Sequence, residues 1–122
     1  MNPSGRPENL KIEALDSPRG ARNLKLTGAF TIQTLFEFQT LARQEAARPI
    51  IVDITHVPYM DSAGLGCVIS VFAACQRTNR GFAIIGVSER IRTLFGVTHV
   101  DGLLPTFESL EAAEAAVTKA SA

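Results

Sequence analysis

The chain has 122 residues, of which 46% are hydrophobic and 20% are charged. These fractions are typical of one globular domain and exclude an intrinsically disordered chain. Twelve basic and twelve acidic residues give a formal net charge of zero. A neutral chain has no electrostatic field to hold a nucleic-acid backbone, so we expect no direct binding of nucleic acid.

The sequence also argues against a membrane protein, a disulfide and a metal site. No run of about 18 apolar residues occurs, and residues 1–7 lack the apolar stretch of a signal peptide, so we expect a cytoplasmic protein without membrane contact. Cys67 and Cys75 fall in one predicted helix, about 12 Å apart along its axis, which is too far for a disulfide. The two histidines and two cysteines do not have the spacing of metal ligands, so we expect no metal site. We expect no other cofactor either.

The N-terminal third predicts a hairpin followed by a helix. Residues 1–9 are rich in proline, glycine and asparagine, and we expect them to be flexible. Alternating apolar residues predict two paired strands around a turn at residues 17–20. A spacing of three or four then predicts a helix of about four turns from Thr31 to Arg48. The apolar positions that carry these predictions are Leu10, Ile12 and Ala14, then Leu24 and Leu26, then Ile32, Leu35, Phe36, Phe38, Leu41 and Ala42.

The remaining residues predict strands alternating with helices. Residues 50–54 and 82–87 are short apolar runs typical of strands that are covered on both faces. A helix with the apolar face Leu65, Val68, Ile69, Phe72 and Cys75 lies between them. We expect Ser88 to cap a short helix with Ile91, Leu94 and Phe95 on its apolar face, ending at Gly96.

A brief edge strand is predicted within residues 103–107, and Ser109 is expected to cap a last helix that carries Leu110, Ala113 and Val117. The predicted fold class is therefore α/β, with about four to five strands in a small mixed sheet and about four helices packed on it.

One motif, residues 61–66 with the sequence DSAGLG, lies where the central strand and its loop lead into the second helix. Each of its two glycines costs about 1 kcal/mol relative to alanine inside a helix. One interpretation is structural: an aspartate or serine caps the helix, and glycine allows close packing on the sheet. The other is functional: glycine lets a partner approach the helix start, where a phosphate on the serine hydroxyl would be favoured.

Over residues 10–118 the chain resembles the STAS domain of bacterial anti-sigma factor antagonists. The resemblance is carried by residues 26–30, 51–66, 81–87 and 101–107. It implies a STAS domain over residues 10–120, a protein that is a monomer or weak dimer, and a binding switch in place of an enzyme. The implied partner is an anti-sigma factor that is also an ATP-dependent serine kinase.

The resemblance assigns Ser62 as the phosphoacceptor. The unphosphorylated protein would bind the anti-sigma factor and release a sigma factor, and the phosphorylated protein would not bind. Gly64 is expected to keep the approach to the partner open. The chain departs from the family pattern after Gly28, where Ala29, Phe30 and Thr31 stand in place of an acidic residue, a leucine and an aspartate or asparagine, so a partner contact made there by a carboxylate is missing. The residues expected to contact the partner are Thr31, Tyr59, Met60, Asp61, Ala63 and Gly64.

Two enzymatic or signalling alternatives lack necessary residues. A response-regulator receiver needs an acidic cluster after its first strand and a late lysine, but the chain has no lysine between Lys25 and Lys119. A serine hydrolase needs glycine two positions before its serine, where Met60 stands here. Within the STAS family, two other roles stay open: a scaffold in a stress-signalling complex, or a subunit of a lipid-transport ABC system.

Overall fold

The computed structural model describes residues 10–44 and 48–120, so the predicted flexible segment at residues 1–9 lies outside the described residues. Within them the chain forms one five-stranded sheet with the order β1-β2-β3-β4-β5. The strands are β1 (Lys11–Asp16), β2 (Arg22–Thr27), β3 (Ile50–His56), β4 (Phe82–Ile85) and β5 (Thr106–Phe107). The helices are α1 (Leu35–Gln44), α2 (Ser62–Arg77), α3 (Glu89–Val97) and α4 (Leu110–Ala120).

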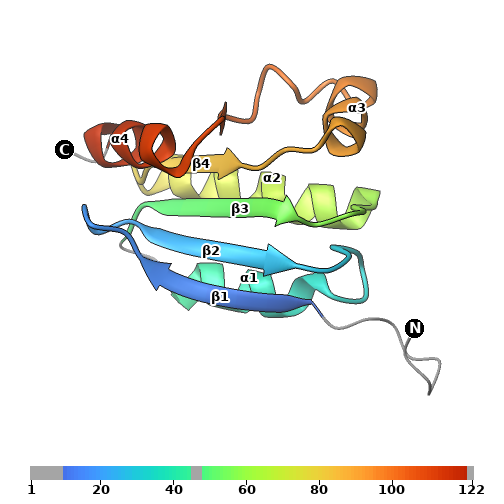
Figure 1. Cartoon of the computed structure of the whole chain (residues 1–122), viewed down its shortest axis with the longest axis horizontal. Helices are drawn as coiled ribbons and strands as arrows, with labels where there is room; N and C mark the ends of the chain where they lie inside the picture. The colour runs from blue at the N-terminus through green and yellow to red at the C-terminus, as the bar shows by residue number, and fades with distance from the viewer. Residues whose placement is uncertain (1–9, 45–47, 121–122) are drawn as a thin grey trace.

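The predicted mixed sheet with its helices is confirmed. β1 and β2 pair antiparallel as a hairpin, and β2, β3, β4 and β5 pair in parallel. Figure 1 shows α1 and α2 side by side behind the sheet, α4 beside β4, and α3 beyond the carboxyl end of β4. Because β2 and β3 are parallel neighbours, their carboxyl ends lie at the same edge of the sheet.

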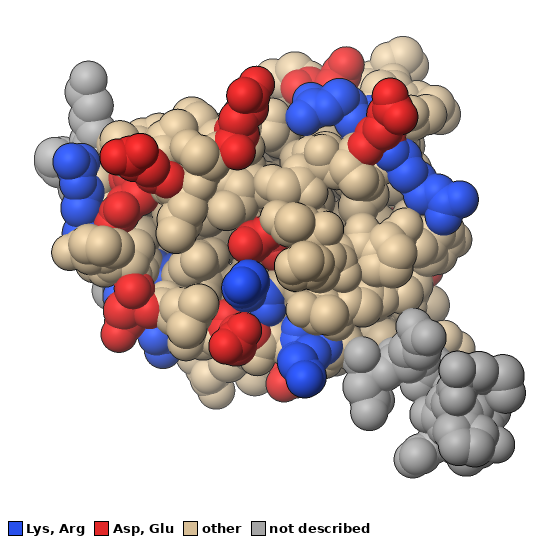
Figure 2. All heavy atoms as spheres, in the orientation of Figure 1, with Lys and Arg blue, Asp and Glu red and all other residues tan. Residues whose placement is uncertain are grey.

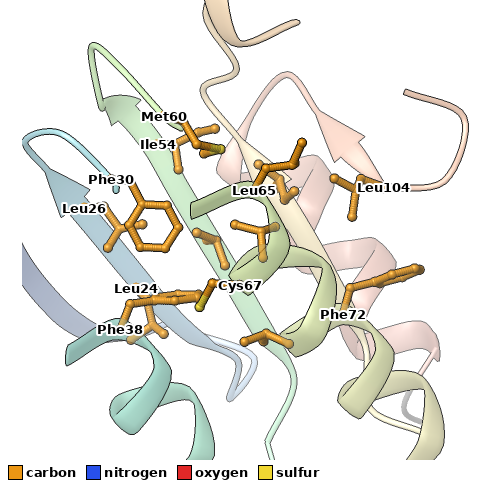
Figure 3. Packing of buried hydrophobic residues seen from close by; sticks show 14 of the residues in the cluster. Leu24, Leu26, Phe30, Phe38, Ile54, Met60, Leu65, Cys67, Phe72 and Leu104 are labelled. Atoms are coloured by element: carbon orange, nitrogen blue, oxygen red, sulfur yellow. The ribbon is translucent and has the colours of Figure 1, made fainter. Parts of the chain in front are cut away.

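Two apolar clusters hold these layers together. The larger cluster fills the space between the sheet and α1, α2 and α3, and Figure 3 shows its side chains between α2 and the strands. Its aromatic pair is Phe30 and Phe38, whose ring centroids are 5.3 Å apart in an edge-to-face arrangement. The smaller cluster joins Ile51 of β3 to Ala113 and Val117 of α4 on the opposite face. β3 therefore has apolar cover on both faces, as its sequence predicts.

Two expected helix caps are confirmed, but α3 does not end at Gly96 as predicted: it runs to Val97, and Thr98 is its C-cap residue. Ser88 accepts a hydrogen bond from the Ile91 amide at 3.2 Å, and Ser109 accepts one from the Ala112 amide at 3.1 Å. The α4 helix is also tied to the hairpin, because the Glu114 carboxylate accepts a hydrogen bond from the Arg19 amide. The serine caps fix where α3 and α4 begin, and the Glu114 contact joins α4 to the hairpin.

The first helix begins later than predicted. Residues 31–34 form a hydrogen-bonded turn, and α1 starts at Leu35. Ile32 and Phe36, which were expected on the buried face, are 54% and 60% exposed. Leu110 of α4 is likewise exposed and does not join the core.

The visible face of the molecule carries a mixture of charges. Figure 2 shows lysine and arginine side chains interspersed with aspartate and glutamate, without a large area of one sign. On the sheet, Lys25 of β2 is paired in register with Glu13 of β1 and with Asp53 of β3. None of the helices in the described ranges has the length and apolar composition needed to cross a membrane.

Candidate functional site

The motif lies at the edge of the sheet where β2 and β3 end. The loop after β2 runs through residues 28–34, and the loop after β3 runs through residues 57–61. Because these strands are parallel neighbours, both loops leave the sheet at its carboxyl edge, where α/β proteins commonly place their functional groups.

Backbone hydrogen bonds join the two loops at Phe30. The Phe30 amide donates to the Tyr59 carbonyl oxygen at 2.9 Å, and the Asp61 amide donates to the Phe30 carbonyl oxygen at 3.3 Å. Phe30 and Met60 thus form an isolated parallel bridge beyond the ends of the named strands. Their side chains point into the interior next to the start of α2 (Figure 3). These hydrogen bonds therefore hold the two loops together next to the start of α2.

Asp61 joins the beginning of α2 to the loop after β2. It is the N-cap residue, with extended backbone, and its Oδ1 accepts a hydrogen bond from the Gly64 amide at 2.8 Å. Its other oxygen, Oδ2, accepts a hydrogen bond from the Ile32 amide at 3.1 Å. The same carboxylate therefore caps α2 and holds the turn that precedes α1.

Ser62 is the first residue of α2 and is exposed. In the described part of the chain, no hydrogen bond is found for its hydroxyl. Ala63, beside it, is partly buried against the larger core cluster. A phosphate on Ser62 would stand at the positive end of a helix of 16 residues, which carries no acidic residue in its first turn. The position can therefore accept a dianion without loss of the helix.

Gly64 does not have the role expected of it. It is buried, and a Cβ at this position would lie 2.3 Å from the carbonyl oxygen of Phe30. Glycine is required because the first turn of α2 packs directly on the backbone of the loop after β2. The expectation that Gly64 keeps the approach to a partner open is wrong, since its missing side chain serves packing inside the chain.

The other expected contact residues divide into buried and accessible groups. Met60 is only 4% exposed and belongs to the core, so its side chain does not face outward. Tyr59, next to it, is 48% exposed. Thr31 is partly buried, and its Oγ1 accepts a hydrogen bond from the Gln33 amide at 3.2 Å, which stabilises the turn before α1.

Two residues that the sequence predicts to be buried are exposed near this edge of the sheet. The exposed side chains of Ile32 and Phe36 belong to the turn held by Asp61 and to the first turn of α1. Their helical spacing predicts a core face and conceals their exposure, because Ile32 lies in the turn before α1 and Phe36 lies on the side of α1 opposite to its buried residues Leu35, Phe38 and Ala42. Exposed large apolar side chains are typical of a protein contact surface, and the Ile32 amide is joined by its hydrogen bond to Asp61, the residue before Ser62.

The other reactive groups among the described residues do not form a second site. Cys67 and Cys75 are free and buried, and burial raises the pKa of the Cys67 thiol to about 11. The thiol is therefore protonated and unreactive at neutral pH. Among the described residues, no group of three or more histidine, cysteine, aspartate or glutamate side chains could hold a metal ion.

Comparison with known proteins identifies the family. A sequence profile of the STAS domain matches residues 18–113. The anti-sigma-B factor antagonist of Staphylococcus aureus (strain NCTC 8325 / PS 47) is 37% identical over 82 residues, which cover 67% of this chain and 76% of that protein. The chain therefore belongs to the STAS domain family, as the motif and its surrounding segments predict.

Solved structures agree with this fold. An anti-sigma factor antagonist from Mycobacterium paratuberculosis superposes with a TM-score of 0.78 at 18% identity, covering 88% of this chain and 93% of that one. The Bacillus cell fate determinant SpoIIAA in its phosphorylated form gives a TM-score of 0.68 at 16% identity, covering 86% and 98% of the two chains. At these identities the likeness establishes the fold.

Proposed function

We propose that this chain is an anti-sigma factor antagonist of the cytoplasm. In its unphosphorylated form it binds an anti-sigma factor and so releases a sigma factor. Its partner is also an ATP-dependent serine kinase, which phosphorylates Ser62 and thereby ends the interaction. The names of the staphylococcal relative and of the mycobacterial structure support this role. The observation that carries it is the exposed hydroxyl of Ser62 at the capped start of α2.

The surface around Ser62 supports protein binding. Ile32 lies in the turn held by Asp61, Phe36 in the first turn of α1, and Tyr59 on the loop before α2, all with exposed side chains. Interfaces commonly place such apolar and aromatic residues around a central polar group, because they exclude water when the surfaces meet. We define these three residues with Thr31, Asp61, Ser62 and Ala63 as the proposed docking surface.

In this proposal the chain is a substrate and the partner supplies the catalysis. The Ser62 Oγ forms a bond to the γ-phosphorus of ATP while the bond from that phosphorus to the β–γ bridging oxygen breaks. ADP leaves, and a base of the kinase takes the hydroxyl proton. No side chain of this chain needs to act as a base, and the docking surface contains no histidine.

Phosphorylation changes the affinity and preserves the fold. The phosphate adds about −1.5 to −2 charges, which the N-terminus of α2 tolerates. Asp61 cannot relieve this charge, because both of its oxygens already accept backbone hydrogen bonds and its own charge is negative. In an interface closed over a neutral hydroxyl, the dianion must be desolvated beside that carboxylate. A loss of about 3 kcal/mol weakens binding more than a hundredfold.

The experiment is phosphorylation by purified anti-sigma factor kinases of the organism that encodes this chain. The chain is incubated with ATP and each kinase, and tryptic peptides are analysed by mass spectrometry. Cleavage after Arg43 and Arg77 gives one peptide that contains Ser62 and also Ser70. We expect one phosphate on this peptide, lost in Ser62→Ala and retained in the matched control Ser70→Ala. Phosphate that persists in Ser62→Ala would contradict the assignment. Copurification with membrane transporter subunits would support the ABC-system role in its place.

A further inference from the structure

A groove on the helical side of the sheet is not used by the proposed function. It lies between α1 and α2, which stand side by side behind the sheet (Figure 1), and its volume is about 420 Å³. Cavities of this size commonly hold small-molecule ligands. None of the residues of the docking surface lines it, and Ala74 in its wall is about 18 Å from Ser62 along the axis of α2. The groove is therefore separate from the proposed phosphorylation site.

Three arginines line this groove. Arg43 lies in the last turn of α1, and Arg77 is the last residue of α2. Because each helix connects two parallel neighbouring strands, both helices run in the same direction and finish at the same end of the groove. Arg80 follows α2, and its guanidinium is held by two hydrogen bonds: Nε donates to the Thr78 Oγ1 at 3.0 Å, and Nη1 donates to the Arg48 carbonyl oxygen at 3.4 Å. The groove therefore has a cationic end.

Positive charge is in excess at this end. Among the described residues, no aspartate or glutamate lines the groove, and neither Arg43 nor Arg77 forms a salt bridge. By contrast, Arg22 and Arg48 share the carboxylate of Asp16 at 2.9 and 2.8 Å. Each helix C-terminus supplies about half a negative charge, which is less than the full positive charge of the arginine in its last turn. Charge therefore remains for an anion to neutralise.

Most of the other lining residues are small and apolar. Ala42 and Val71 are buried between the helices, and Ala73 and Ala74 are half-buried beside them. A hollow with an apolar wall and guanidinium groups at one end fits a molecule that has an apolar body and an anionic group. The planar guanidinium binds phosphate through two parallel hydrogen bonds. We propose that this groove binds a small organic phosphate, with the phosphate against the arginines and the body against the alanines.

The test is a titration of the isotope-labelled chain with phenyl phosphate, followed by the chemical shifts of the backbone amides in NMR spectra. Phenyl phosphate has the phosphate monoester and an apolar body that fits the groove. We expect saturable shifts in the last turns of α1 and α2 with a Kd of about 1 mM. Inorganic phosphate, which lacks the apolar body, and phenol, which lacks the anion, should each bind at least about tenfold more weakly.

Variants test the two ends of the groove separately. Arg43→Gln and Arg77→Gln should each raise Kd for phenyl phosphate at least about fivefold, because a charge-assisted hydrogen bond is lost. The matched control is Arg92→Gln, since Arg92 is an exposed arginine of α3 that does not line the groove, and its Kd should be unchanged. Ala74→Leu fills the apolar part without a change of charge and should raise Kd at least about tenfold.

The titration of the unmodified chain decides the proposal even if a variant fails to fold, which circular dichroism detects. Saturable shifts at the groove with the expected order of ligands support it. The absence of saturation at about 10 mM phenyl phosphate, or saturable shifts only elsewhere in the chain, would overturn it. Inorganic phosphate that binds as tightly as phenyl phosphate, or folded Arg43→Gln and Arg77→Gln variants with unchanged Kd, would overturn it as well. None of these results depends on Ser62, so each leaves the proposed function as it stands.

Discussion

Replacing Gly64 by alanine tests how the start of α2 is held. The added Cβ would stand 2.3 Å from the Phe30 carbonyl oxygen, whereas Cβ atoms essentially never approach closer than 3.0 Å. Either α2 or the loop after β2 must therefore move by at least about 0.7 Å. The same Phe30 carbonyl accepts a hydrogen bond from the Asp61 amide, and Asp61 caps the Gly64 amide, so the shift also disturbs these contacts.

The magnitude follows from opposing terms. Alanine gains about 1 kcal/mol of helix propensity over glycine. Overpacking costs about 1–3 kcal/mol, and a weakened N-cap costs about 1 kcal/mol more. We therefore expect Gly64→Ala to lower the free energy of unfolding by about 1–3 kcal/mol.

Urea unfolding followed by far-ultraviolet circular dichroism measures this change. Gly66→Ala is the matched control, since the same substitution two positions later meets no neighbour and should raise the free energy of unfolding by about 0.5–1 kcal/mol. A Gly64→Ala variant as stable as the unmodified chain would refute the packing role given to Gly64.

Three further predictions use the same unfolding assay or a chemical probe. Asp61→Ala should lower the free energy of unfolding by about 1–2 kcal/mol, because the Gly64 and Ile32 amides lose their acceptor; an unchanged urea midpoint would contradict this role. Hydrogen bonds from the Ser17 side chain and the Arg19 amide hold the pKa of the Glu114 carboxyl below its usual value. This carboxylate therefore stabilises the fold above its usual pKa, and that stabilisation is lost as the pH falls through the lowered value. In Glu114→Gln the free energy of unfolding should fall less steeply below about pH 5 than in the unmodified chain. An unaltered dependence on pH would contradict this role of Glu114. Because burial raises the pKa of Cys67 to about 11, a thiol reagent at pH 8 should label it in urea but not in the native protein, and rapid native labelling would exclude its burial.

The sequence predicted the strands and helices well, because their hydrophobic periodicity reflects which faces are buried. Alternation placed the hairpin, and continuous apolar runs placed β3 and β4 in the centre of the sheet. The start of α1 was the main error in the fold. Ile32 and Phe36 have helical spacing, but the Thr34 side chain bonds back to Ala29 and the Ile32 amide bonds to Asp61. Neither the local hydrogen bond of Thr34 nor the hydrogen bond between Ile32 and the distant Asp61 can be read from hydrophobic periodicity.

The site was predicted in part for a similar reason. The motif identified the helix start and its accessible serine, because a capping aspartate followed by a small polar residue is a local signal. It could not distinguish the two glycines, since their roles depend on the position of the Phe30 carbonyl oxygen. Nor could it show that Met60 faces the core and Tyr59 faces outward, because both follow a proline in an irregular loop.

The central claim is that the charge on Ser62 decides whether the partner binds. The most direct measurement is the calorimetric Kd of one purified anti-sigma factor kinase for the chain before and after stoichiometric phosphorylation of Ser62, with circular dichroism confirming that both forms are folded. The account predicts tight binding before modification and affinity at least a hundredfold weaker afterwards. Equal affinity of two folded forms would contradict it.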